Sequence, residues 1–195
     1  MATKYSKRDR ILRAAAESFA AKDYHEVRTD DIAAAAGVGK GTVFRYFPTK
    51  EELFIATLMH GIEIAIAEID QALAGIAGPI EKLSALCCHL TAFYQRNEHF
   101  FRLLHSEKSL AEQPQHGEWH KRQAELRERI ASIVRQGQER GCFRKLDAAF
   151  IARLLFGMIR AALRSEIKVK PAPEIADSLL EVFLYGIAKQ KGKSG

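Results

Sequence analysis

The sequence predicts an all-α protein of about nine helices, three in an N-terminal head and six in the body that follows. Apolar residues recur at steps of three and four along most of the chain, which is the period of an amphipathic helix. Short segments rich in Gly and Pro separate these stretches, and none of the stretches shows the alternation typical of a strand. No internal repeat interrupts the pattern. The sequence therefore favours helices packed on helices.

The first predicted helix runs from Ser6 to about Lys22. Ser6 followed by Asp9 is the pattern of a capping box, in which each side chain accepts from a backbone N–H of the other residue. The same logic predicts that Thr49 and Asp147 begin two later helices. One stripe of the first helix has helical spacing and is expected to be buried: Ile11, Leu12, Ala15 and Phe19.

Two short helices joined by a tight turn are predicted next. Thr29 is expected to cap the first of them, with Asp30 and Asp31 in its positive first turn. Gly37 ends it, because glycine accepts the left-handed backbone that a sharp turn requires. Its apolar face is small and suits close packing against a neighbour: Ile32, Ala33 and Ala36.

The second short helix covers about residues 40–47 and ends before Pro48. Val43 and Phe47 share one side of it and are expected to be buried. The opposite side is basic and carries hydroxyl groups: Lys40, Thr42, Arg45 and Tyr46. A helix, a glycine turn and a helix with such an outer face is typical of helix-turn-helix proteins that read DNA.

Six further helices are predicted after this motif. The first, from Lys50 to about Leu73, is long enough to belong to both head and body. Polar or Gly/Pro-containing segments at 75–79, 109–117 and 168–173 separate the helices that follow, and the chain closes on a polar tail. We place the head at residues 5–65, with the helix-turn-helix at about 28–47, and the body at 66–195.

Charge and cysteine content narrow the class of protein. The net charge is +6, and residues 1–50 hold 10 basic against 6 acidic side chains, which favours a polyanionic partner for the head. The three cysteines have no paired spacing, so a disulfide framework is not expected. No signal peptide or long apolar run is recognisable, and the sequence predicts a soluble, cytoplasmic protein.

Candidate DNA contacts follow from the chemistry of the head. Arg28 and Lys50 can pair with phosphates, and Thr29 can offer a hydroxyl to the same backbone. Lys40 can donate to guanine, and Thr42 can touch a base edge or a thymine methyl. Arg45 and Tyr46 come one turn later, at phosphate or base distance.

The stretch from Ala33 to Leu53, with the pattern AxxAGVGKGTVFRYFPTKEEL, resembles the DNA-binding signature of the tetracycline-repressor (TetR) family of bacterial transcription regulators. The resemblance includes the preceding helix and covers about the first third of the chain. Position 44 is commonly tyrosine in that family, whereas Phe44 has no hydroxyl to reach a phosphate. The resemblance implies these contacts to DNA: Thr29, Lys40, Gly41, Thr42, Phe44, Tyr46 and Lys50.

The resemblance also implies an effector pocket in the body. The candidates are mainly aromatic, and for any one aromatic residue plain core packing is the commoner explanation. The full set is Phe93, Tyr94, Phe101, His105, Trp119, Phe156 and Arg160. Arg160 and Arg164 lie one turn apart. If the two arginines face the pocket, they favour an anionic effector. If they face outward or toward a second subunit, they say nothing about the charge of the effector.

In the resembled family the last two helices form a homodimer interface. Small residues there permit close approach of helices, and two recognition helices related by two-fold symmetry can read a palindromic operator. The candidate interface residues are Phe150, Leu154, Gly157, Ala161, Leu179, Val182, Phe183 and Gly186.

Other chemistries have weaker support. GVGKGT at 37–42 lacks the earlier glycine of a phosphate-binding loop and follows a helical segment. His116 and His120 have a chelating spacing but few further ligands, and Cys87 is expected to be a buried thiol. We therefore expect no enzyme activity, cofactor or metal. The leading hypothesis is an effector-released repressor. The alternative is a helical ligand-binding or interaction module without DNA regulation.

Overall fold

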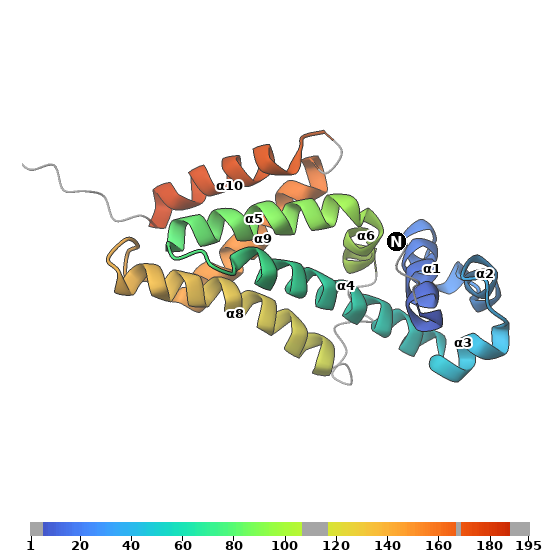
Figure 1. Ribbon diagram of the computed structural model, residues 1–195. Coiled ribbons are helices and arrows are strands. Elements are labelled where there is room, and N and C mark those ends of the chain that lie inside the picture. Colours follow the sequence, from blue (N-terminus) through green and yellow to red (C-terminus); the bar gives the residue numbers. More distant parts are fainter. Residues whose placement is uncertain (1–5, 107–116, 167–168, 188–195) are drawn as a thin grey trace, which may run out of the picture. The chain divides into compact units, whose positions relative to one another are not determined.

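The computed structural model describes residues 6–106, 117–166 and 169–187. Within these ranges the chain forms nine α-helices, one short 3-10 helix and no strand (Figure 1), which confirms the predicted all-α fold. The predicted C-terminal tail and nearly all of the predicted loop at 109–117 lie outside the described residues. The elements are α1 (Lys7–Ala21), η1 (Tyr24–Glu26), α2 (Thr29–Ala35), α3 (Lys40–Tyr46), α4 (Lys50–Leu73), α5 (Pro79–Arg96), α6 (Glu98–Ser106), α8 (Gly117–Glu139), α9 (Ala148–Glu166) and α10 (Ala172–Ile187).

The chain divides into two compact units. Unit 1 consists of residues 1–64 and 97–122, and unit 2 of residues 65–96 and 123–195. Unit 1 therefore takes in α6, which the division by sequence placed with the body. Both α4 and α8 begin in unit 1 and continue into unit 2.

Local signals in the sequence form the helix ends of unit 1. Ser6 and Asp9 make the predicted capping box, in which Asp9 N–H donates to Ser6 Oγ at 3.1 Å and Ser6 N–H to Asp9 Oδ2 at 3.3 Å. Thr49 Oγ1 accepts from Glu52 N–H at 3.0 Å at the start of α4. The hydrogen bond that Asp9 accepts from Ser6 also lowers the pKa of the Asp9 carboxyl.

An aromatic cluster forms the centre of unit 1. Phe19 of α1 and Phe54 of α4 are buried, with ring centroids 5.2 Å apart in an edge-to-face arrangement. Tyr24 of η1 lies against both, at 5.8 Å from Phe19 and 5.4 Å from Phe54. The cluster therefore ties together α1, η1 and the N-terminal part of α4.

In unit 2, α5 packs along α10, and α9 contacts both of them (Figure 1). The core is apolar and includes Leu83, Leu86 and Leu90 of α5, all without exposed surface. At its edge, Arg129 of α8 forms two parallel hydrogen bonds of 2.7 Å to the Asp70 carboxylate of α4. This pairing lowers the pKa of Asp70 and raises that of Arg129.

The end of α8 depends on a close approach at Gly137. The chain turns back at Gly141, which has a φ of 72°, and Cys142 and Phe143 N–H both donate to the Gly137 carbonyl. The buried Phe143 ring then occupies the space where a side chain at position 137 would stand.

Gly137→Ala is therefore expected to destabilise the protein by about 1–3 kcal/mol, because the added methyl group overlaps the Phe143 ring. Gly117→Ala, in the same helix where no atom lies within 4 Å, is the matched control and should leave stability nearly unchanged. Urea denaturation of both variants measures the difference. Equal midpoints for the two would show that the Phe143 ring moves aside at no cost.

Candidate nucleic-acid interface

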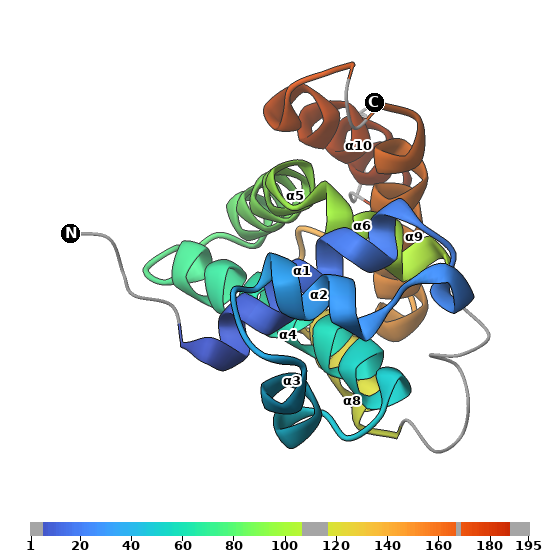
Figure 2. The same ribbon diagram turned by 90° about the vertical axis from the view of Figure 1, so that its right-hand side faces the viewer.

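The α2–turn–α3 motif is the candidate interface, and its turn forms as predicted. Gly37 adopts a φ of 63°. Its N–H donates to the Ala34 carbonyl at 3.1 Å, and the Val38 N–H donates to the Ala33 carbonyl at 3.0 Å. These bonds satisfy carbonyls that the end of α2 leaves without helical partners. Figure 2 shows α3 following α2 directly after this turn.

The two faces of α3 differ as the sequence predicts. Val43 is 1% exposed and Phe47, just after the helix, is 6% exposed. Thr42 is half-buried. The remaining side of the helix faces outward and consists of Lys40, Gly41, Phe44, Arg45 and Tyr46. A short helix with one buried edge and one polar, basic edge is suited to enter a major groove.

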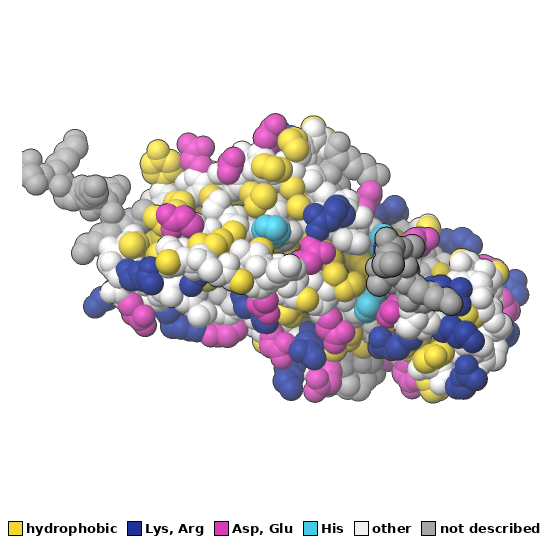
Figure 3. Space-filling view, in the orientation of Figure 1, with side chains coloured by type: hydrophobic (Ala, Val, Ile, Leu, Met, Phe, Trp, Pro, Cys, Tyr) yellow, Lys and Arg dark blue, Asp and Glu magenta, His cyan; other side chains and the backbone are white. Residues whose placement is uncertain are grey.

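Lysine and arginine side chains recur over the surface formed by α1, α2 and α3, with acidic side chains between them (Figure 3). Two acidic groups, Asp30 and Asp31, lie within the motif itself, and Asp30 is close to two candidate cations. The Asp30 carboxylate is 2.8 Å from Lys40 Nζ and 3.9 Å from Arg28 Nη2. The sequence shows Asp30 in the first turn of α2, but it does not reveal this pairing, because the partner lies ten residues away across the turn.

Lys50 has a more enclosed position than the other candidate cations. Its Nζ lies 4.5 Å from the centroid of the Tyr24 ring and donates to the His25 carbonyl at 3.3 Å. Partial burial lowers the pKa of its ammonium group. These contacts hold Lys50 at the start of α4, and neither partner could be found from sequence, since both lie about 25 residues earlier.

The predicted cap of α2 is wrong. Arg28 occupies the N-cap position with an extended backbone, and no side chain caps the helix. Thr29 is already the first helical residue, so its hydroxyl is not placed to accept from the next N–H groups. The backbone carbonyl of Arg28 accepts from Asp31 N–H at 3.1 Å and from Ile32 N–H at 3.3 Å.

The seven effector candidates are divided between the units. Phe101 and Trp119 are buried in unit 1, and the side chain of His105 lies outside the described part. Phe93, Tyr94, Phe156 and Arg160 belong to unit 2.

The four candidates of unit 2 form two pairs, one on α5 and one on α9. The Phe93 and Tyr94 rings are 5.4 Å apart, and the Arg160 guanidinium lies 5.9 Å from the centroid of Phe156. Burial raises the pKa of Tyr94 to about 12, and the charge of Arg160 opposes this shift.

The candidate dimer residues fall into exposed and buried groups. Phe150 and Leu154 of α9 are 49% and 46% exposed, and Val182 of α10 is 67% exposed. Gly157 and Ala161 are also exposed. Leu179 and Phe183 are buried in their own subunit. Gly186 lies in α10, and its burial is outside the description.

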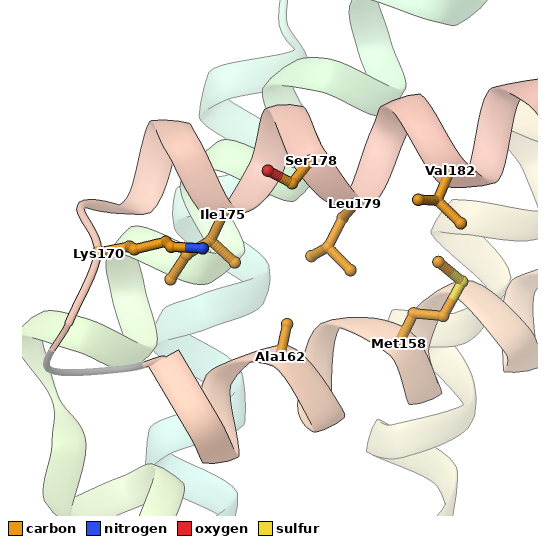
Figure 4. A pocket seen from close by; sticks show the side chains of 7 residues that line it. All are labelled: Met158, Ala162, Lys170, Ile175, Ser178, Leu179 and Val182. Carbon is orange, nitrogen blue, oxygen red and sulfur yellow. The ribbon is translucent and has the colours of Figure 1, made fainter.

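A shallow apolar groove of about 150 Å³ runs between α9 and α10. Figure 4 shows Met158 and Ala162 on one wall, with Leu179 and Val182 of α10 opposite them. Hydrophobic side chains are also visible along α10 in Figure 3. The groove adjoins the exposed residues of α9, so apolar surface extends over both helices.

The described residues give little support to a reactive thiol or a metal site. Cys87 is buried, and burial raises the pKa of its thiol to about 12, which makes it a poor nucleophile at neutral pH. Among the described residues no group of three His, Cys, Asp or Glu side chains is placed to hold a metal ion. His116 lies outside that part of the chain. None of the described helices has both the length and the apolar character needed to cross a membrane.

Two family models match the two parts of the chain. The family described as "Bacterial regulatory proteins, tetR family" matches residues 11–57, and "Tetracyclin repressor-like, C-terminal domain" matches residues 77–164. The chain belongs to the TetR family. This TetR-family protein is thus a DNA-binding transcription regulator, of a family of regulators and not of enzymes.

Relatives match this TetR-family chain over nearly its full length. It is 26% identical to the HTH-type transcriptional repressor KstR2 of Mycolicibacterium smegmatis, over 96% of this chain and 93% of the relative. The solved structure of PfmR from Thermus thermophilus has a TM-score of 0.79 and 27% identity, covering 91% of this chain and 98% of that one. A putative fatty acid metabolism regulator from Clostridium perfringens has a TM-score of 0.78 and 27% identity, covering 93% and 100%.

Proposed function

We propose that this protein is a cytoplasmic transcriptional repressor that binds a palindromic operator as a homodimer and is released by a small-molecule effector. The outward face of α3 carries the proposal, because it presents basic, aromatic and hydroxyl groups on a helix whose other edge is buried. The direction of regulation rests on the relative named a repressor. In this proposal residues 5–65 read DNA, and residues 66–195 bind the effector and the second subunit.

The proposed contacts divide by chemistry. Lys40, Gly41 and Thr42 at the start of α3 face base edges, with Phe44 making only van der Waals contact. The other contacts go to phosphate and set the register: Arg28, Thr29, Arg45, Tyr46 and Lys50. Two copies of α3 related by a two-fold axis would occupy successive major grooves, about 34 Å apart.

The apolar surface of α9 and α10 supports the dimer. Phe150, Leu154, Gly157 and Ala161 follow one line of α9 at steps of four, three and four residues, and all are exposed. Val182 continues this surface onto α10. Exposed apolar residues in one contiguous patch are typical of a protein–protein interface.

The proposed effector is an apolar metabolite with an anionic group, such as an acyl-coenzyme A. Buried aromatic rings at Phe93, Tyr94 and Phe156 suit an apolar ligand. Burial lowers the pKa of Arg127, and the charges of Arg153 and Arg160 lower it further, so an anion near these three guanidinium groups would be stabilised. The relative named as a fatty acid metabolism regulator is consistent with this class.

The proposal is tested in two steps. Selection from a randomised duplex library with the purified protein identifies the operator, and fluorescence anisotropy at fixed salt compares it with random duplex. Palmitoyl-coenzyme A, coenzyme A and palmitate are then titrated into the complex, and release by the first alone supports the effector class. Activation of a reporter carrying the operator would contradict repression. Absence of DNA binding even at low salt would favour the ligand-binding module.

Lys50→Ala is expected to weaken binding to the operator and to random duplex by the same factor. Its ammonium group contacts phosphate in the proposal, and phosphate contacts release counterions. The homodimer loses one such contact in each subunit, so the slope of log affinity against log salt should become shallower by about 2. Lys145→Ala, an exposed lysine of unit 2 with the same charge change, is the control. Anisotropy titrations at several salt concentrations measure both slopes.

An unchanged salt slope for Lys50→Ala would show that this lysine does not contact phosphate. Thr42→Ala serves as the contrasting variant, because a residue at a base edge should change the ranking of sequences while leaving the salt slope in place.

A further inference from the structure

The Asp30 carboxylate lies between two of the proposed DNA-contacting cations. Lys40 Nζ is 2.8 Å from Oδ1 and donates to Oδ2 at 3.1 Å, and Arg28 Nη2 is 3.9 Å from Oδ2. These are surface groups, with 43% of the Asp30 side chain and 58% of the Lys40 side chain exposed. An acidic group in this place is unexpected in a surface that must approach a polyanion, since it opposes attraction to every phosphate nearby.

We infer that Asp30 is a positioning residue that raises the sequence specificity of this regulator by holding Lys40. The inference rests on the proposed function and adds to it a residue that none of the proposed DNA contacts includes. Asp30 itself touches no base in this scheme. It acts through the direction and the effective charge of the Lys40 side chain.

The physical argument compares two kinds of DNA. On random duplex, Lys40 gains most by turning to the nearest phosphate, and it must give up the carboxylate to do so. On the operator, the ammonium keeps the carboxylate and offers a remaining N–H donor to a base edge, since an ammonium has three donors. The ion pair therefore weakens binding to random duplex more than binding to the operator.

A role in folding does not explain the pair. Exposed ion pairs contribute little to stability, and Asp30 and Asp31 share the first turn of α2, where both are favourable to the helix dipole. Asp31 also has a cation nearby, Lys22, at 3.9 Å. Because Lys22 is not among the proposed DNA contacts, Asp31→Asn makes the same charge change one residue away without touching Lys40.

The test uses the full-length dimer with four variants: Asp30→Asn, Asp31→Asn, Lys40→Ala and the double variant Asp30→Asn/Lys40→Ala. Each is titrated by anisotropy against random duplex and against the operator obtained by selection, at several salt concentrations. Asp30→Asn is expected to bind random duplex roughly 25-fold more tightly, about fivefold for each subunit, which is the scale of one close charge interaction in water. Its ratio of operator to random affinity should fall, and its salt slope on random duplex should steepen by about 2, one for each subunit.

Asp31→Asn is expected to change both affinities alike and so to keep the ratio. In the Lys40→Ala background, Asp30→Asn should also keep the ratio, because the side chain through which it acts is gone. Equal ratios for the two Asn variants, or an effect of Asp30→Asn that persists without Lys40, would overturn the inference while leaving the regulator in place. Failure of the unmodified protein to bind either duplex would instead overturn the proposed function together with the inference.

Discussion

Leu154→Asp is expected to convert the dimer to a monomer and to lower operator affinity by roughly 10²–10⁴-fold, the gain that joining two binding modules supplies. Leu154 is 46% exposed in the middle of the apolar line on α9, next to Phe150, which is 49% exposed. A carboxylate there would be buried against apolar surface of the second subunit without a partner, which costs several kcal/mol in each subunit. Sedimentation equilibrium measures the mass, and anisotropy measures the affinity.

Leu146→Asp is the matched control. Leu146 is also an exposed leucine of unit 2, at 38%, but it precedes α9 and lies outside the proposed interface. This variant should remain a dimer with unchanged affinity. A dimeric Leu154→Asp would exclude this line of α9 as the interface. A monomer that kept full operator affinity would show that operator binding does not require dimerisation.

Phe54→Ala is expected to lower the free energy of unfolding by about 3–5 kcal/mol. The side chain has no exposed surface and contacts the rings of Phe19 and Tyr24, so its removal opens a cavity where α1, η1 and α4 meet. Tyr24 in turn supports Lys50. Phe54→Ala should therefore also weaken DNA binding, because Tyr24 would no longer hold Lys50, a proposed phosphate contact, in place.

Phe44→Ala is the control for this variant, since it makes the same chemical change on the exposed face of α3. Its free energy of unfolding, measured by urea denaturation, should equal that of the unmodified protein within about 0.5 kcal/mol, while its DNA affinity falls. Equal midpoints for Phe54→Ala and Phe44→Ala would show that the aromatic cluster is not the centre of unit 1.

The features that the sequence predicts well are those encoded by neighbouring residues. The Ser6 capping box, the left-handed Gly37 and the buried edge of α3 each depend on a few consecutive positions, and all three are present. The cap assigned to Thr29 fails by one position, because a hydroxyl can serve either as a cap or as the first helical residue, and the pattern of residue types is the same in both cases.

What the sequence does not predict are pairings across the chain. The contact of Asp30 with Lys40 depends on how the turn sets α2 against α3, and the enclosure of Lys50 depends on η1. Apolar periodicity likewise shows that Phe183 and Val182 belong to a helix, but neighbouring helices decide that the first is buried and the second exposed. For the same reason, apolar periodicity does not predict which of the effector candidates lie close together in space.

Membership of α6 in unit 1 has a consequence for protein engineering. Phe100 of α6 packs directly over Gly61 of α4, where a Cβ at position 61 would lie 2.7 Å from the ring, and α6 also lies along α1. A chimera that grafts residues 6–64 onto the body of another regulator would lack α6. The surfaces of α1 and α4 against which α6 packs would then be exposed. Hybrid biosensors should therefore transplant residues 97–106 together with the N-terminal segment, or retain Gly61 and a ring at position 100.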